Sequence, residues 1–429
     1  MTQVFRTIAL PVLVLVSAIC GLQLKTAMSA EPTVEVNPTS SSSTASGDAS
    51  VFSLPHVPLT IELFTHGGFD DNVGTSQSSS AQSSFFVNGG GSLFYDLPTV
   101  TTHVTVKAGA DATYYFQHTN GQQDDVNVYI NGSLLHNVSA RLKLEATLYA
   151  TYRTEPDFGA NVGSSNRIGN FFHTLDSLKA TYNWTERFAT ATSDKVQVIN
   201  YEGNSSQATS LNHLENTVGQ ELRYDLLHAG NTVVAEYRFE VVDYDSDTPR
   251  NSITHFALGG FDEDFTTYLK LVARGGATFR DYSSGANRTD PYFEGSLTYE
   301  GPHHSSLALR ANYGIEEPSV EQVQSRTTFR IGLEYKYGLT DRITASLDGY
   351  YHHDDNTGAI PVGGATVGPT PMLMSKFSED SFDISLNLRY QMSRRFSIET
   401  GVEYSDVSSQ LQGQQYSRLR SFAGLRVTF

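Results

Sequence analysis

Strict alternation of apolar and polar residues is the feature that most limits what this chain can fold into. It runs through residues 142–150, 329–337 and 382–391, and again through the end of the chain, 416–429. Successive side chains of an extended strand point to opposite faces, so each segment has one apolar face and one polar face. Comparable segments recur about every 20 residues from residue 57 onward. They predict an all-β protein of about 18 strands, with about 16 to 20 as the bounds.

The connections between these segments favour a membrane barrel over a soluble sandwich. Predicted strands begin near residues 59, 84, 100, 125, 140, 171, 188, 215, 231, 252, 266, 291, 305, 326, 342, 380, 395 and 416. Links after even-numbered strands are short: 96–99, 137–139, 185–187, 228–231, 262–264, 301–304, 338–341 and 392–394. Links after odd-numbered strands are mostly longer, including 66–83, 154–170, 202–213, 316–325 and 353–377. Short periplasmic turns and long extracellular loops are typical of outer-membrane β-barrels, and an even strand count returns both barrel ends to the short-turn side.

A barrel in lipid has to be closed. No segment after residue 57 has the roughly 18 consecutive apolar residues of a membrane helix. Lipid offers no partner to an unpaired backbone group, so the first and last strands are expected to pair in a closed antiparallel transmembrane β-barrel. Aromatic residues near segment ends favour two interfacial girdles when taken together. They are Tyr114, Tyr152, Trp184, Phe188, Tyr224, Tyr299, Tyr313, Tyr337, Tyr351, Phe396 and Phe429.

The beginning of the chain is typical of an exported protein. Arg6 precedes an apolar run over residues 8–22, and small residues follow at 26–30. This order predicts a cleaved signal peptide over residues 1–30. Cys20 raises the alternative of a lipoprotein signal, but the residue before it is an isoleucine, which is larger than the residue usual at that place.

The remainder divides into a linker and one large unit. Residues 31–56 are rich in Ser, Ala and Gly and predict a flexible periplasmic linker. Residues 57–429 keep one composition throughout and predict a single barrel domain. If Cys20 leaves with the signal peptide, the mature chain has no cysteine, which excludes disulfides, zinc–thiolate sites and cysteine nucleophiles.

The polar faces of the strands predict a charged pore lining. Strand parity places residues of both signs inside: Arg238, Arg274, Arg310, Arg330, Arg389, Arg418, Arg420, Arg426, Glu221, Glu236, Glu334, Glu399 and Glu403. The two signs nearly balance, so most of the chain's net charge of −17 is expected in loops, turns and linker. A barrel of about 18 strands encloses more space than side chains fill, which favours a water channel of weak ion selectivity unless a loop plugs it.

Clusters that could carry chemistry lack the required spacing. In His352-His353-Asp354-Asp355 the adjacent histidines of a strand point to opposite faces, which disfavours a shared metal. Asp70-Asp71-Asn72 and Asp243–Asp247 have calcium-type oxygens but no known calcium-loop spacing, so solvated loop acids are the simpler interpretation. His303-His304 is most simply a turn. We therefore predict that the protein has no catalytic residue, metal or cofactor and that it is not an enzyme.

The end of the chain resembles the assembly signal of outer-membrane barrels. Ala423, Leu425, Val427 and the terminal Phe429 place apolar side chains at alternate positions. The start of the barrel, with residues 69–73 at the outer end of the first strand and Phe94-Tyr95 closing the second, is similar to the porin-2-like family of β-barrel porins. The resemblance covers nearly all of 57–429. Some members of that broad group are linked to export of surface polysaccharide.

Function stays open between a channel for solutes or exported polysaccharide, a plugged scaffold or adhesin, and, less favoured, a barrel enzyme. The expected location is the outer membrane of a Gram-negative bacterium. Expected partners are its lipid and lipopolysaccharide, the barrel assembly machinery and periplasmic polysaccharide-export components, with no nucleic acid. The segment 354–376, rich in Gly, Pro and small apolar residues and ending in Met372-Leu373-Met374, is predicted to fold into or across the barrel mouth as a gate.

Overall fold

The described part of the chain is built of antiparallel strands. The computed structural model describes residues 59–119, 122–159, 167, 169–202, 210–226, 230–245, 250–283, 287–302, 305–320, 323–359, 376–411 and 413–429. The strands within it are β1 (Leu59–Asp70), β2 (Ser84–Pro98), β3 (Thr102–Thr119), β4 (Gln122–Asn137), β5 (Leu142–Arg153), β6 (Phe171–Asn183), β7 (Phe188–Tyr201), β8 (His213–Asp225), β9 (Asn231–Tyr244), β10 (Ser252–Asp264), β11 (Leu269–Tyr282), β12 (Arg288–Gly301), β13 (Ser305–Glu316), β14 (Val323–Thr340), β15 (Ile343–Ala359), β16 (Lys376–Gln391), β17 (Phe396–Ser409) and β18 (Tyr416–Thr428). The expected signal peptide and linker lie outside these residues.

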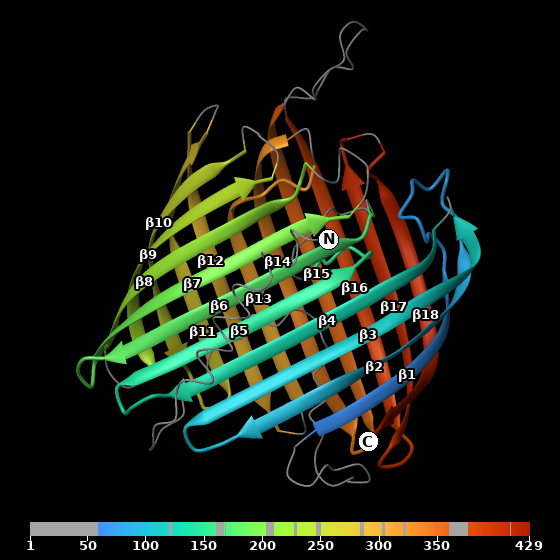
Figure 1. The fold of residues 1–429 in the computed structure, drawn as a ribbon, viewed down its shortest axis with the longest axis horizontal. Coiled ribbons are helices and arrows are strands. Elements are labelled where there is room, and N and C mark those ends of the chain that lie inside the picture. The colour runs from blue at the N-terminus through green and yellow to red at the C-terminus, as the bar shows by residue number, and fades with distance from the viewer. Residues whose placement is uncertain are drawn as a thin grey trace, which may run out of the picture.

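Each strand pairs with the next along the chain, and the sheet closes on itself (Figure 1). The closing pair is β1 with β18, in register from Glu62 opposite Thr428 to Asp70 opposite Arg420. The Phe429 amide donates to the Ile61 carbonyl at 2.8 Å, and the Ile61 amide donates to the Phe429 carbonyl at 3.1 Å. The predicted closed antiparallel barrel of 18 strands is therefore confirmed.

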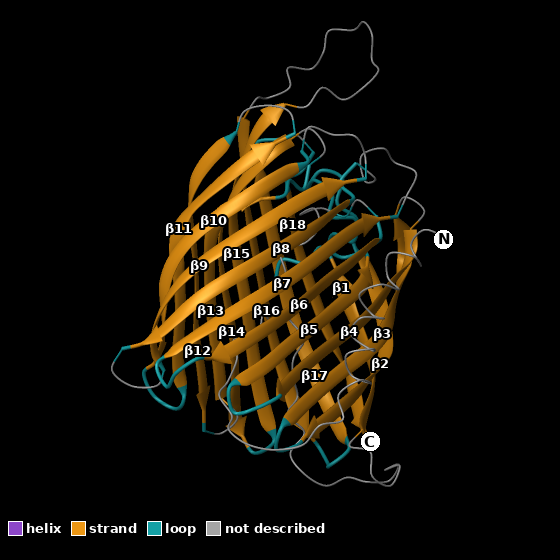
Figure 2. Cartoon of the chain, turned by 60° about the vertical axis from the view of Figure 1, so that its left-hand side comes forward, coloured by secondary structure: helices purple, strands orange, loops and turns teal. Residues whose placement is uncertain are grey.

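The two rims of the barrel differ (Figure 2). At the turn end, the rim that holds the first residue of β1 and the last of β18, the links are short; at the loop end most links are longer. Some predicted bounds were wrong: residues 262–264 belong to β10, so that turn comprises 265–268, and residues 66–70 belong to β1. The link at 120–121 is short although it follows an odd-numbered strand, which the prediction of mostly longer links allowed.

One face of the sheet is apolar and exposed, as a lipid-facing surface requires. Leu63, Leu386 and Leu425 are each about half exposed on it, and Trp184 and Phe396 lie beside the turns. The alternate positions face the interior and include buried Glu, Asp and Arg. Within the described ranges no helix is long and apolar enough to cross a membrane.

Candidate functional site: the barrel interior

A ladder of alternating charges lines one arc of the interior. Lys179 contacts Glu221 at 2.5 Å, and Glu221 continues to Arg223 at 3.0 Å. The ladder then runs through Arg223–Asp262, Asp262–Arg274, Arg274–Glu236, Glu236–Arg238 and Arg238–Glu294, with distances from 2.5 to 3.5 Å. The ladder runs from β6 to β12 and contains four cations and four acids, so its charges balance.

The opposite arc is organised around Glu399 of β17. Its carboxylate accepts from Arg426 at 2.7 Å, lies 2.6 Å from Nε of Arg389 and contacts His66 at 3.1 Å. Arg426 also reaches Glu62 of β1 at 3.0 Å, across the closing pair of strands. The side chains of one β17 acid and one β18 base therefore cross-link strands from β16 to β1.

The predicted pore-lining residues all lie at positions that alternate with exposed apolar ones. Arg310 pairs with Glu334 at 2.6 Å, and Arg420 lies 3.7 Å from Glu403. Arg330 is half buried on the same face of β14, within electrostatic reach of His352. Arg418 differs from the others, because it is buried at the loop end of the barrel and contacts Glu155 in the loop after β5.

The connection between β5 and β6, residues 154–170, folds into the barrel in its described part. Thr154 and Asp157 are buried, and Asp157 accepts from Arg153 at 2.6 Å and from the Tyr149 hydroxyl at 3.3 Å. Both donors belong to β5, so the loop turns inward directly after its own strand. We refer to residues 154–170 as the β5–β6 loop.

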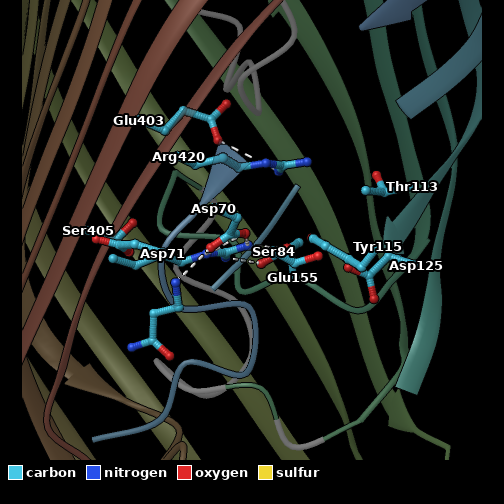
Figure 3. A network of polar contacts seen from close by, with 12 residues as sticks. Asp70, Asp71, Ser84, Thr113, Tyr115, Asp125, Glu155, Glu403, Ser405 and Arg420 are labelled. Atoms are coloured by element: carbon cyan, nitrogen blue, oxygen red, sulfur yellow. Dashed lines mark hydrogen bonds and ion pairs between the residues drawn. The ribbon is translucent and has the colours of Figure 1, made fainter. Parts of the chain in front are cut away.

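Glu155 connects this loop to β18 and β1, the two strands that close the barrel (Figure 3). Its carboxylate accepts two bonds from Arg418 of β18, at 2.7 and 3.0 Å. Arg418 also binds Asp70 of β1 through Nε and a terminal nitrogen, and Asp70 has no exposed surface. Glu155 further accepts from Arg167 of the same loop, which binds Asp125 of β4 at 2.6 Å.

Phe158 carries the loop to the far wall. Its ring packs edge-on against His352 of β15, with centroids 6.1 Å apart. His352 is buried and faces the interior. In the strand order, β15 lies about half the circumference away from β5 and β6, so this contact requires the loop to cross the lumen. The loop is thus held to three parts of the wall: β4, the closing pair of β18 and β1, and β15.

Other loops also pack inward at the loop end. Val73, Leu211 and Val320 come from three different loops, and each lies in an apolar cluster with interior residues of the neighbouring strands. Glu317, after β13, accepts from Tyr244 of β9 at 2.7 Å and from Arg280 of β11 at 2.5 Å. Loop side chains therefore pack against interior residues of the strands at this rim.

These positions correct two sequence-based interpretations. Asp70 and Asn72 are buried rather than solvated; only Asp71 of that run is exposed. Residues 354–359 belong to β15 and not to a gate, and the remainder of the proposed gate, 360–375, lies outside the described residues.

The His352–Asp355 run alternates between the two faces. His352 and Asp354 are buried toward the interior, whereas the His353 side chain is 39% exposed and contacts Asp380 at 2.8 Å. Among the described residues no three His, Cys, Asp or Glu side chains are grouped to hold a metal ion. His303-His304 lies outside the described residues.

A closed barrel with a lipid-facing exterior and a charged interior defines the class of outer-membrane β-barrels. The model of the family described as "Putative beta-barrel porin 2" matches residues 62–429, and the chain belongs to this family. The resemblance found in the sequence is therefore confirmed, and the chain is a porin-type barrel of the outer membrane.

Solved structures resemble the chain only distantly. OccAB3 of Acinetobacter baumannii is 10% identical with a TM-score of 0.41, over 88% of this chain and 100% of that one. OccK2 of Pseudomonas aeruginosa, solved with glucuronate, is 8% identical with a TM-score of 0.40, over 88% and 97%. The siderophore receptor PirA of P. aeruginosa is 11% identical with a TM-score of 0.38, over 86% and 80%. No curated protein matches the chain.

Proposed function

We propose that this protein is a passive channel for small hydrophilic solutes, narrowed at the loop end by the β5–β6 loop. The observation that supports this is the anchoring of one loop to three parts of the wall, through Glu155, Phe158 and Arg167. A loop fixed across the lumen divides the cross-section, and the charged lining at the turn end keeps the remaining path hydrated. Such a path suits small solutes better than a continuous polymer.

Two alternatives differ from this proposal in what passes through the barrel. A conduit for exported surface polysaccharide requires the β5–β6 loop to move aside over the full width of a sugar chain. A plugged barrel acting as a surface scaffold requires no passage at all, and the apolar clusters at the loop end are the feature that favours it.

Planar-bilayer recordings of the purified protein test the proposal. The intact barrel should conduct in small steps, and Glu155→Gln should raise the conductance, because it weakens the contacts with Arg418 and Arg167. Asp243→Asn, outside the β5–β6 loop network, is the control and should behave as the native protein. Absence of conductance from all three would favour the plugged scaffold, whereas equal conductance would remove the loop from the permeation path.

A further inference from the structure

We infer that solutes pass the β5–β6 loop on one side of the barrel only, between the loop and the strands around β10. Lys195 and the charge ladder from Lys179 to Glu294 then determine which solutes pass. The inference rests on the proposed channel and adds its route. It comes from the shape of the barrel wall, from the side on which the loop is anchored, and from the hydration of the charges on each side.

Five interior glycines mark two sharp bends in the wall. At each of them a Cβ atom would overlap a backbone carbonyl oxygen of the neighbouring strand, so the two backbones approach more closely than a larger residue allows. Three lie in β18, β1 and β2, and two lie in β10 and β11: Gly424, Gly68, Gly90, Gly260 and Gly276. Because β1 and β10 are nine strands apart in an 18-stranded barrel, the bends lie at opposite edges.

The two bends leave two broad walls that face each other. In Figure 1, β3 to β8 form the nearer wall and β12 to β16 the farther one, with β10 at the left edge and β1 and β18 at the right. The β5–β6 loop starts in the middle of one wall, and Phe158 reaches His352 in the middle of the other. The loop therefore divides the interior into a half from β15 through β1 to β5 and a half from β6 to β14. We call them the β1 half and the β10 half.

The loop closes the β1 half. Its wall partners Arg418 of β18 and Asp125 of β4 both belong to this half. The Arg167 amide donates to the hydroxyl of Thr75, a buried residue of the β1–β2 loop, at 3.0 Å. Asn72 of the same loop donates to a carbonyl of β18 at 3.0 Å. Two loops thus join each other and the wall across this half.

The charges of the two halves differ in hydration. In the β1 half, the side chains of Arg167 and Arg418, which hold the loop, are 5% and 9% exposed. In the β10 half, Lys179 and Glu294 at the ends of the ladder are 32% and 31% exposed. The described loop contacts of Glu317 in this half join β9 and β11 at the bend itself and do not span the broad walls. The hydrated route past the loop therefore runs beside β10.

Lys195 and Glu403 offer a matched comparison between the halves. In β7, Lys195 lies one interior position nearer the turn end than the row of Tyr149, which binds the loop. In β17, Glu403 lies one interior position nearer the turn end than the row of Arg418. Lys195 is exposed and the Glu403 side chain is 39% exposed, so a reagent can reach both positions. Figure 3 shows Glu403 beside the network that holds the loop.

Cysteines at these two positions test the route. Lys195→Cys and Glu403→Cys are each modified with a bulky, uncharged methanethiosulfonate reagent in a planar bilayer, and the native barrel with the same reagent is the control. Modification at position 195 should lower the single-channel conductance by about half or more, because it narrows the route. Modification at position 403 should lower it by about a tenth or less. An equal or stronger block at position 403 would overturn the inference.

Charge reversal gives a second measurement. In a KCl gradient, Lys195→Glu should lower the chloride-to-potassium permeability ratio by about twofold or more, whereas Glu403→Lys should leave it nearly unchanged. If the native barrel conducts and both variants shift the ratio equally, the route is wrong and the channel stands.

Thiol labelling on intact cells separates the route from the channel proposal. If the native barrel does not conduct, the channel proposal fails. A cysteine at position 195 that reacts with an impermeant reagent, while one at position 403 does not, would then still support access beside β10. Any other labelling pattern in a barrel that does not conduct would overturn the route as well.

Discussion

The two ends of the barrel use the same residue types in different surroundings. At the loop end, Arg418 joins the wholly buried Asp70 to Glu155, and the ion pairs hold loops in place. Nearer the turn end, the side chains of Arg310 and Glu334 are 28% and 23% exposed, so they keep part of their hydration. The comparison teaches that charge inside a barrel has two roles. Desolvated pairs fix structure, whereas hydrated pairs shape the field along the lumen.

Replacing one arginine of each kind should give the largest difference in the free energy of unfolding. Arg418→Leu leaves Asp70 without its ion-pair partner in a buried position, which should cost about 3–5 kcal/mol in the free energy of unfolding. Arg310→Leu, nearer the turn end, should cost about 1 kcal/mol or less, because water replaces the lost contact. Urea unfolding in lipid, followed by gel mobility, measures both. Equal losses would mean that the two ends do not differ in hydration.

A second comparison concerns the two faces of one strand. Leu386 of β16 faces lipid and is 48% exposed, and the neighbouring Ser385 faces the interior and donates to Asp348 at 3.3 Å. Leu386→Arg should destabilise the folded barrel by about 2–4 kcal/mol, because it puts a charge into the bilayer. Ser385→Arg should have a smaller effect. A larger loss from the serine variant would reverse the assigned faces.

The seam between β1 and β18 is expected to be sensitive to the loss of the last residue of the chain. Deleting Phe429 removes two backbone hydrogen bonds to Ile61, worth about 1–3 kcal/mol together. It also removes the terminal aromatic residue that we predict the assembly machinery reads. The fraction of heat-modifiable barrel in membranes should fall; replacing Phe429 by Tyr, which keeps the backbone and the ring, should restore it. An unchanged fraction after the deletion would contradict both roles.

The orientation of the two ends in the cell can be read by labelling. Ser79 lies exposed in the β1–β2 loop at the loop end, and Thr340 lies exposed at the turn end. A cysteine at Ser79 should react with an impermeant reagent on intact cells, whereas one at Thr340 should react only after lysis, because long loops face outward. Labelling at position 340 alone on intact cells would show that the orientation is the reverse.

The alternation of apolar and polar residues allowed the fold to be predicted from the sequence. A one-residue error of register would move every apolar side chain to the wrong face, so the pattern in residues 329–337 and 382–391 specifies both strand and facing. Most strand starts were predicted within a few residues, and the charged lining was assigned from parity alone. The boundaries at 262–264 and 354–359 were wrong because polar residues continue a strand where it passes beyond the lipid.

The inward path of the β5–β6 loop could not be found in this way. Apolar composition pointed to residues 360–375, which lie outside the described residues, whereas the β5–β6 loop is held inside the barrel by Glu155 and Arg167. Their partners, Asp125 and Arg418, are far away in the sequence, and periodicity carries no information on such contacts. An acid and an arginine in one long loop were the only local signal.

The most direct test of the account is whether the β5–β6 loop crosses the lumen to β15. Cysteines in place of Phe158 and His352 should be joined by a short bifunctional thiol reagent in the folded barrel, since their rings lie 6.1 Å apart. The cross-linked barrel should keep the native conductance while losing the increase expected from Glu155→Gln, because the link holds the loop where Glu155 otherwise does. A pair that never cross-links, while Phe158→Cys alone still reacts with thiol reagents, would show that the loop does not reach the far wall.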